Sequence, residues 1–204
     1  MKSLLFSLAL LVALLPSFGQ TTFKVVAGNA NTIVQFTSKA TTETVVGTTH
    51  TATGSIEFDP SSSGQGARGD IHVDLSSIKT GLALRDRHMR QNQLETGKYP
   101  EAVFTLTSLT LPSGGLPEGI LTRVNVKGTF SLHGVEHSIE PESYITLSNS
   151  SSGTAISVAS NFTLRLADYN IKRPQFLMLR LAEEQQMTVK LFAQSSERVA
   201  AGTP

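Results

Sequence analysis

The chain has 204 residues, and its 17 lysines and arginines against 16 aspartates and glutamates give a formal net charge of +1. This near neutrality argues against a nucleic-acid partner, because phosphate binding requires a surplus of basic charge. The absence of cysteine excludes disulfides, thiol catalysis, lipoprotein acylation and thiolate metal sites. A chain of this length suits one domain, and no internal repeat or long interior linker divides it.

The N-terminus has the three regions of a signal peptide. Lys2 supplies the positive end, residues 4–15 form an apolar run, and Ser17 and Gly19 place small residues before a cleavage point. The alternative, a membrane anchor, is disfavoured because the run is well short of the roughly 20 residues of a spanning helix. Cleavage would leave a formally neutral, periplasmic or secreted protein. The predicted division is a signal peptide at 1–19, a barrel domain at 20–195 and a flexible tail at 196–204.

Most of the mature chain alternates apolar and polar residues, which is the pattern of strands with one buried face. Turn signals separate these runs, for example at Asp59-Pro60, residues 112–119 and His133-Gly134. Many such strands predict an all-β barrel or sandwich, and closure into a barrel would leave no exposed edge. The apolar rows are Val34 and Phe36; Ile56 and Phe58; Ile71, Val73 and Leu75; Ala102, Phe104 and Leu106; Val124, Val126, Phe130 and Leu132; Ile156, Val158, Phe162 and Leu164; and Met187, Val189 and Leu191.

Two segments depart from this alternation. Residues 77–96 are rich in good helix formers, with Ser76 or Ser77 available as an N-cap and Gly97 beyond the end, so they predict a helical insert. Residues 174–184 crowd several large apolar side chains together. This second segment predicts a short helix or a buried loop at one end of the barrel.

The insert carries Arg85, Asp86 and His88, for which the residues alone leave two interpretations open. They could hold a general acid or base, since His and a carboxylate are common partners in proton transfer. They could equally form a charged helix surface with local ion pairs. No nucleophile motif accompanies them, which disfavours catalysis.

No motif in the chain calls for a cofactor or a metal ion. A Gly-x-Gly-x-x-Gly pattern at 64–69 follows a Ser-rich turn and opens a strand, whereas a dinucleotide site requires a preceding strand and a following helix. His133 and His137 lack a third ligand at a suitable spacing, and Gly134 between them more simply forms a hairpin turn. We therefore predict no cofactor, no metal site and no catalytic residues.

Several motifs follow one another in a fixed order between residues 54 and 135. They are Gly-Ser-Ile-Glu-Phe-Asp at 54–59, Ser-Ile-Lys-Thr-Gly at 77–81, Arg-Asp-Arg-His at 85–88, Lys-Tyr-Pro at 98–100 before Phe104, and Val-Lys-Gly-Thr-Phe-Ser-Leu-His-Gly-Val at 126–135. In this order and spacing the chain resembles the YceI-like family, over nearly all of its length after the first twenty residues. The resemblance implies a lipocalin-like antiparallel β-barrel, of about eight strands, whose lumen holds a long isoprenoid or similar lipid tail. It also places Arg85, Asp86 and His88 near the barrel opening, where they could orient a lipid head group or lock the helix over the strands, which is the third interpretation of this motif.

The chain departs from the family pattern in two places. Asn170 stands where the family segment usually has glycine, and both residues tolerate the left-handed backbone conformation, so the turn can be kept. The first mature strand, at 31–39, lacks two histidines that the family often shows. Any head-group role of those histidines is therefore not carried over to this chain.

The apolar rows are where core and binding site are hardest to separate, because an eight-stranded barrel either fills with side chains or holds one ligand. The resemblance favours a cavity that binds a polyisoprenoid or quinone-like lipid. The alternatives are a structural or stress-related interaction protein with a filled barrel and, less favoured, a lipid-modifying enzyme using His88 or His133. The sequence leaves a homodimer open. Predicted lipid contacts are Phe36, Phe58, Ile71, Val73, Phe104, Leu106, Phe130, Leu132 and Phe162, and the predicted polar mouth is Arg85, His88 and Arg165.

Overall fold

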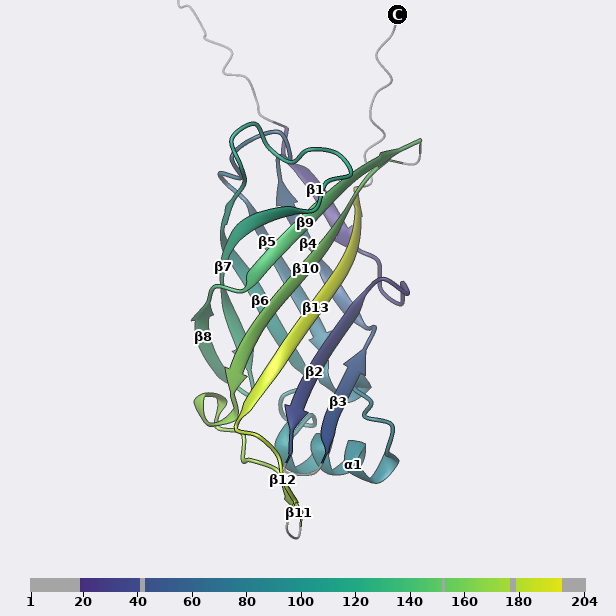
Figure 1. The fold of residues 1–204 in the computed structure, drawn as a ribbon, viewed down its shortest axis with the longest axis vertical. Helices are drawn as coiled ribbons and strands as arrows, with labels where there is room; N and C mark the ends of the chain where they lie inside the picture. The colour runs from purple at the N-terminus through teal and green to yellow at the C-terminus, as the bar shows by residue number, and fades with distance from the viewer. Residues whose placement is uncertain (1–18, 41–42, 152, 177–178, 196–204) are drawn as a thin grey trace, which may run out of the picture.

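The computed structural model describes residues 19–40, 43–151, 153–176 and 179–195. The predicted signal peptide, apart from Gly19, and the predicted tail at 196–204 lie outside these residues. The described chain forms an antiparallel barrel that is longer than it is wide (Figure 1).

Eight antiparallel strands close into a ring in the order β1-β4-β5-β6-β7-β9-β10-β13, with β13 returning to pair with β1. The predicted all-β, lipocalin-like barrel is therefore confirmed. The ring strands are β1 (Thr21–Val25), β4 (Ala52–Phe58), β5 (Arg68–Asp74), β6 (Glu101–Thr110), β7 (Thr122–Leu132), β9 (Glu142–Ser150), β10 (Gly153–Arg165) and β13 (Glu184–Ser195).

Three further strands lengthen the wall at one end. β2 (Ile33–Lys39) pairs with β13 beyond the end of β1, β3 (Thr44–Thr49) pairs with β2, and β8 (Val135–Ile139) pairs with β7 beyond the end of β9. The predicted apolar rows did not include β1, β3, β8 or β9. Their apolar alternation is short or interrupted, so pairing with neighbouring strands is what makes them strands.

The barrel end that holds the start of β1 and the end of β13 is closed by its own core. Phe23 and Phe58 are fully buried there, with ring centroids 5.2 Å apart. The β4–β5 and β6–β7 connections cross this end, where Leu111 N donates to Ser63 O and Leu116 N donates to Pro60 O. Leu111 and Leu116 are buried in the same cluster, so the two loops and the two phenylalanines together seal this end.

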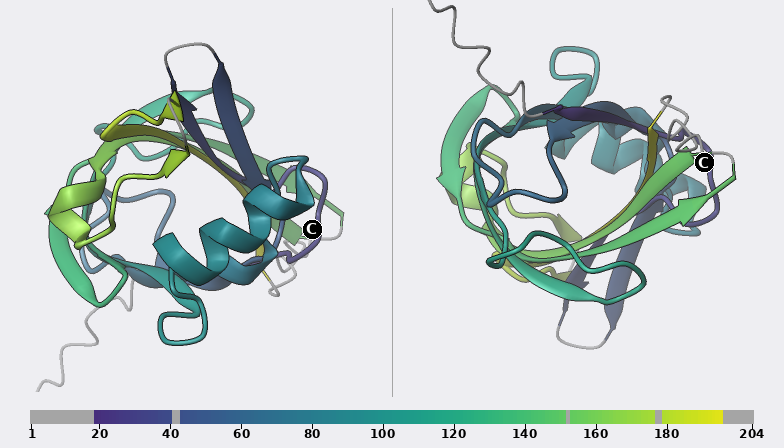
Figure 2. Two further views of the ribbon diagram at one scale, coloured as in Figure 1. Left: turned by 90° about the horizontal axis from the view of Figure 1, so that it is seen from below. Right: turned by 90° about the horizontal axis from the view of Figure 1, so that it is seen from above.

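The opposite end carries the helical insert (Figures 1 and 2). A 3₁₀ turn, η1 (Leu75–Ser77), follows β5, and helix α1 (Ala83–His88) continues into a π-type turn, η2 (Met89–Gln93). The predicted insert is thus confirmed, but its N-cap is Leu82 rather than Ser76 or Ser77. Asp74 caps η1 instead, by accepting a hydrogen bond from Ser76 N.

The segment at 174–184 is not a helix, which corrects the helical alternative of the prediction. It contains the small hairpin of β11 (Gln175–Phe176) and β12 (Leu179–Arg180), beyond the 3₁₀ turn η3 (Leu166–Tyr169). Leu181 N donates to Pro174 O, and Ala182 N donates to Lys39 O. Backbone pairing to β2, a distant segment, therefore prevails over local helix propensity here.

Candidate functional site

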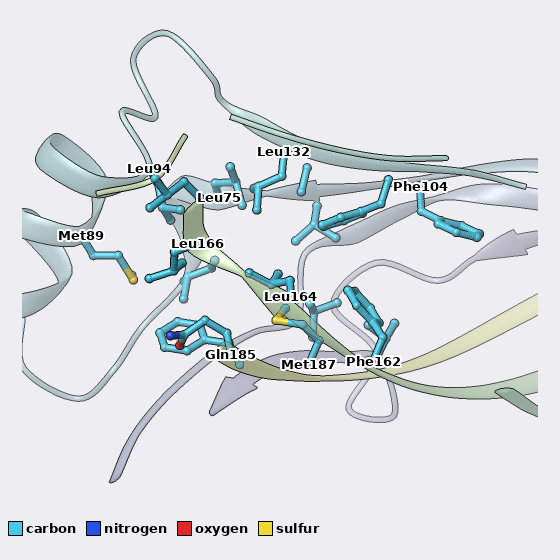
Figure 3. Close-up of a pocket in the computed structure, with 18 of the residues that line it drawn as sticks. Leu75, Met89, Leu94, Phe104, Leu132, Phe162, Leu164, Leu166, Gln185 and Met187 are labelled. Atoms are coloured by element: carbon cyan, nitrogen blue, oxygen red, sulfur yellow. The ribbon is translucent and has the colours of Figure 1, made fainter. Parts of the chain in front are cut away.

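The lumen between the closed end and the insert is a cavity of about 780 Å³. This volume lies within the range of small-molecule sites, which is roughly 300–1,000 Å³. Every ring strand except β1 contributes side chains to its wall, because successive residues of a strand point alternately into and out of the barrel. Figure 3 shows Phe104, Phe162 and Met187 on the wall, with Leu94 and Met89 of the insert at the mouth.

Two of the bulky wall residues lie directly over glycines. A Cβ on Gly47 would lie 2.1 Å from the Phe36 ring, and a Cβ on Gly128 would lie 2.3 Å from the Phe104 ring. Any side chain at these two positions would push the phenylalanine into the lumen. The glycines therefore keep the lumen open where aromatic side chains line it.

The ring strands contribute only two polar side chains to the cavity wall, Ser160 and Gln185. The Ser160 hydroxyl shares a hydrogen bond of 2.8 Å with the Ser143 hydroxyl. The Gln185 side-chain nitrogen donates to Ala182 O at 2.7 Å. These contacts engage polar groups that could otherwise fix a polar ligand, so the wall offers mainly apolar surface.

A hydrogen-bonded network around Thr80 fixes the start of α1 at the cavity mouth. The Thr80 backbone nitrogen and hydroxyl both donate to Asp86 Oδ1, at 2.8 and 2.5 Å. Arg85 donates from Nε to the Thr80 hydroxyl and from Nη2 to Thr80 O, both at 2.9 Å. Arg85 Nη1 lies 3.4 Å from Oε1 of Glu43, the residue just before β3. Of the three interpretations of this motif, the geometry favours anchoring the insert over the strands.

Asp86 is only 5% exposed and is nevertheless held as a carboxylate. Burial acts to raise the pKa of Asp86, but the two hydrogen bonds from Thr80 and the charges of Lys79 and Arg90 act in the opposite direction. The net effect lowers the pKa of this carboxyl below its usual value of 3.8. Ionised Asp86 therefore stabilises the folded insert.

Replacing Asp86 by alanine is expected to lower the free energy of unfolding by about 2–4 kcal/mol at neutral pH, because two charge-assisted hydrogen bonds are lost. Urea unfolding measures this change. Asp70→Ala is the matched control: Asp70 is exposed and accepts one hydroxyl bond from Thr105, so about 1 kcal/mol or less is expected.

The pH dependence of the free energy of unfolding, compared between wild type and Asp86→Asn, checks the contact between Asp86 and Thr80. Because the folded pKa is below the unfolded one, the stabilisation is fully present above pH 3.8 and is lost as the pH falls through the folded pKa. The free energy of unfolding of the wild type should therefore exceed that of Asp86→Asn by a constant amount near neutral pH. This difference should shrink in strong acid. A margin independent of pH throughout would contradict the assignment.

All of the predicted lipid contacts except Phe58 lie on the cavity wall. Phe58 is in the same apolar row as Ile56, but it lies at the end of β4, where Phe23 and the crossing loops fill the barrel. The structure therefore places Phe58 in the closed-end core rather than on the wall. The sequence pattern correctly placed Phe58 on the inward face of β4, but it did not reveal how far along the barrel Phe58 lies.

Arg85 and His88 line the cavity at its mouth, and Arg165 does not. Arg165 is the exposed last residue of β10, next to the inward-facing Leu164. It lies beside Arg173 and Glu183 in a shallow depression outside the lumen. The prediction that Arg165 belongs to the polar mouth is therefore wrong. Successive residues of a strand point to opposite faces, so the inward position of Leu164 already implied that Arg165 points outward.

Gln185 is a lining residue that the sequence reasoning missed. It is 5% exposed and shares the inward row of β13 with Met187, Val189 and Leu191. The signal was available, because a residue two positions before Met187 in a strand faces the same side. A polar residue in an inward row should therefore have been singled out.

His133 and His137 form contacts outside the lumen that join the β7–β8 hairpin to neighbouring segments. His133 and Gly134, with φ values of 54° and 76°, form the two-residue turn between β7 and β8, as predicted. The His133 ring lies within hydrogen-bond distance of Glu95 Oε2, at 2.8 Å, and of Tyr169 O, at 3.1 Å. His137 Nε2 lies 2.9 Å from the backbone oxygen of Asp168. These contacts tie the end of the insert and η3 to the β7–β8 hairpin.

The neighbouring turn keeps its geometry despite its changed residue. Asn170 follows η3 with φ 55° and ψ 22°, so the expected left-handed conformation is confirmed. Within the described ranges, no group of three or more His, Cys, Asp or Glu side chains is arranged to hold a metal ion. Nor does that part of the chain contain a helix both long and apolar enough to cross a membrane.

A closed antiparallel barrel whose apolar lumen opens beside a short helical insert defines a lipocalin-like fold. The chain belongs to the YceI-like domain family, whose model matches residues 25–193. The predicted family is therefore confirmed.

One relative and two solved structures are similar to this chain. The chain is 27% identical over 106 residues to protein YceI of Escherichia coli O17:K52:H18, a match that spans about half of each chain (50% and 51%). A polyisoprenoid binding domain from Saccharophagus degradans, implicated in plant cell wall breakdown, aligns with a TM-score of 0.65 and 19% identity, over 86% of this chain and 99% of that one. BcnA of Burkholderia cenocepacia aligns with a TM-score of 0.65 and 17% identity, over 81% and 98%.

Proposed function

We propose that this protein is an exported, non-catalytic carrier that sequesters a long-chain apolar lipid, polyisoprenoid or quinone-like, in its barrel lumen. The observation that carries the proposal is the cavity of about 780 Å³ whose strand walls are almost wholly apolar. The Saccharophagus degradans domain with the same fold is described as polyisoprenoid binding, which supports this ligand class.

Burial of the tail supplies the binding free energy, at roughly 0.8 kcal/mol for each CH₂ removed from water. The wall is held by paired strands, and its aromatic residues are seated over glycines. A cavity already shaped for the tail reduces the ordering cost on binding. The mouth residues Arg85, Glu43 and Asn92 leave the polar end of the lipid near water.

Two other functions are less well supported by the geometry. A filled barrel with a purely structural role does not fit a lumen of this volume. A lipid-modifying enzyme would need a proton-transfer group aimed at the ligand, yet the His133 ring contacts Glu95 and Tyr169 outside the lumen. His88 remains at the mouth, where it lines the cavity.

Export is part of the proposal and depends on the sequence pattern of residues 1–19 alone. A cleaved signal peptide would deliver the barrel to the periplasm or the exterior, where a tail in transit must be shielded from water. N-terminal sequencing of the protein from its own host should find Gln20 at the start.

Native mass spectrometry of the mature protein purified from its host is expected to show one lipid per chain, identified after organic extraction. Protein stripped of lipid should take up an added polyprenol at one molecule per barrel, because the lumen holds a single tail. A protein that is empty as isolated and that also takes up no added polyprenol would refute the carrier function. Lipid hydrolysed or altered during incubation would instead point to an enzyme.

A further inference from the structure

The lumen mouth is bordered by apolar side chains that face solvent. Leu82 and Leu84 are 57% and 53% exposed, at the start of α1, and both also line the cavity. Figure 2 shows α1 lying across one side of the open end of the barrel. Leu82 and Leu84 therefore present apolar surface both to solvent and to the lumen.

Basic residues flank this exposed pair along the chain. Lys79 and Arg87 are exposed on either side of the two leucines in the chain, and His88 follows them. The segment at 75–99 holds a clear surplus of basic residues, although the whole chain has a formal net charge of only +1. Its basic residues are Lys79, Arg85, Arg87, Arg90 and Lys98, and its acidic residues are Asp86 and Glu95. Glu43, on the neighbouring β2–β3 connection, pairs with Arg85 and offsets part of this charge, but a surplus of basic residues remains along the insert.

A second exposed apolar pair lies at the closed end of the barrel and lacks this charge. Ile120 and Leu121, in the β6–β7 connection, are 57% and 64% exposed. The charged residues next to this pair in the chain are Glu118 and Arg123, and Arg123 lies 3.8 Å from Glu142, so this pair has no surplus of basic residues beside it. Apolar exposure alone therefore does not distinguish the two ends, whereas apolar exposure combined with positive charge does.

We propose that Lys79, Leu82, Leu84 and Arg87, here called the mouth patch, dock on an anionic lipid bilayer. The leucines would enter the headgroup boundary while the cations contact acidic headgroups, the combination used by interfacial helices. This inference rests on the proposed carrier function, because docking at the mouth lets a tail pass between bilayer and lumen without exposing its CH₂ groups to water.

Vesicle flotation tests the charge component. Wild type should bind phosphatidylcholine vesicles that contain phosphatidylglycerol, bind pure phosphatidylcholine vesicles much more weakly, and dissociate as salt is raised. Lys79→Gln/Arg87→Gln should bind the anionic vesicles about tenfold or more weakly, since each cation is worth roughly fivefold. Neither residue lines the cavity, so this variant should take up polyprenol delivered in ethanol as wild type does.

The apolar component has a matched control in the same chain. Leu82→Ser/Leu84→Ser should lower affinity for the anionic vesicles by roughly tenfold or more, because the inserted apolar area is lost. Ile120→Ser/Leu121→Ser removes a similarly exposed pair at the far end and should leave vesicle affinity unchanged.

The outcomes separate the docking surface from the carrier function. Wild type that fails to float with anionic vesicles, or an equal loss in the two serine variants, overturns the docking surface. A dimer in vesicle-free ultracentrifugation that Leu82→Ser/Leu84→Ser converts to a monomer would assign the leucines to a second copy and also overturn it. Vesicle binding without any uptake of polyprenol would leave the docking surface standing and refute the carrier function.

Discussion

Replacing Phe58 by alanine is expected to lower the free energy of unfolding by about 3–5 kcal/mol, the usual cost of deleting a fully buried aromatic ring. Phe58 is 0% exposed and its ring packs against Phe23, which is also 0% exposed. The surrounding strands are paired on both sides and cannot collapse fully onto the void. Urea or thermal unfolding of the lipid-free protein measures this effect.

Phe104→Ala is the matched control, because Phe104 faces the lumen and its removal enlarges an existing cavity. Its effect on stability should be less than half that of Phe58→Ala. Its effect on lipid affinity should be the larger of the two, because Phe58 does not line the wall. Equal stabilities for the two variants, or a Phe58→Ala protein that is stable but cannot bind lipid, would show that the closed end is part of the binding site.

Replacing Val158 by glutamate is expected to lower the affinity for a polyprenol by roughly 100-fold or more, because an apolar tail would have to displace water from a buried carboxylate. Val158 lies on β10, paired with Ile145 of β9 and Leu191 of β13, and all three line the cavity. A charge at this depth obstructs the tail far from the mouth. Fluorescent polyprenol displacement or native mass spectrometry measures the loss.

Ser157→Glu is the control for this variant. Ser157 is the neighbouring residue on the same strand, is exposed, and points away from the lumen. Ser157→Glu should bind lipid as wild type does, which separates the effect of a lumenal charge from that of a charge elsewhere on β10.

Thermal unfolding of the unliganded proteins checks that the variants fold, because a Val158→Glu chain that does not fold gives no information on the lumen. In that case Val158→Gln, uncharged and close in size to glutamate, provides a milder test with the same expected direction.

The barrel and most of its wall could be predicted because a strand presents alternate residues to opposite faces. Phe104 and Leu106, or Phe130 and Leu132, identify an inward row wherever the other face is solvated. The same alternation identifies outward residues: Arg165 follows the inward-facing Leu164 and therefore points outside.

Other features depended on contacts between segments distant in the chain. Phe58 and Ile56 are two residues apart on one face, yet one lies in the sealed end and the other on the cavity wall. The difference arises from the β6–β7 connection, which brings Leu111 and Leu116 across the barrel end. No periodicity within β4 can report where such a loop will cross.

The helical insert was predictable in part from local composition and in part depended on contacts that composition does not reveal. Its helix-forming composition predicted the helix, but its start was decided by Thr80 and Asp86, whose hydrogen bonds span six residues. At 174–184 the apolar composition favoured a helix or a buried loop, whereas the backbone bond from Ala182 to Lys39 draws this segment to β2.

By itself, the amino-acid sequence determined most of the strand pattern and of the inward rows, the position of the helical insert and the family, since these depend on local periodicity and on the order of short motifs. The tertiary structure alone decided that the lumen is open rather than filled, where its floor lies, and that exposed leucines and cations share its mouth. Volume and surface continuity arise from the distances between strands and loops far apart in the chain, and a pattern along one strand contains no measure of those distances.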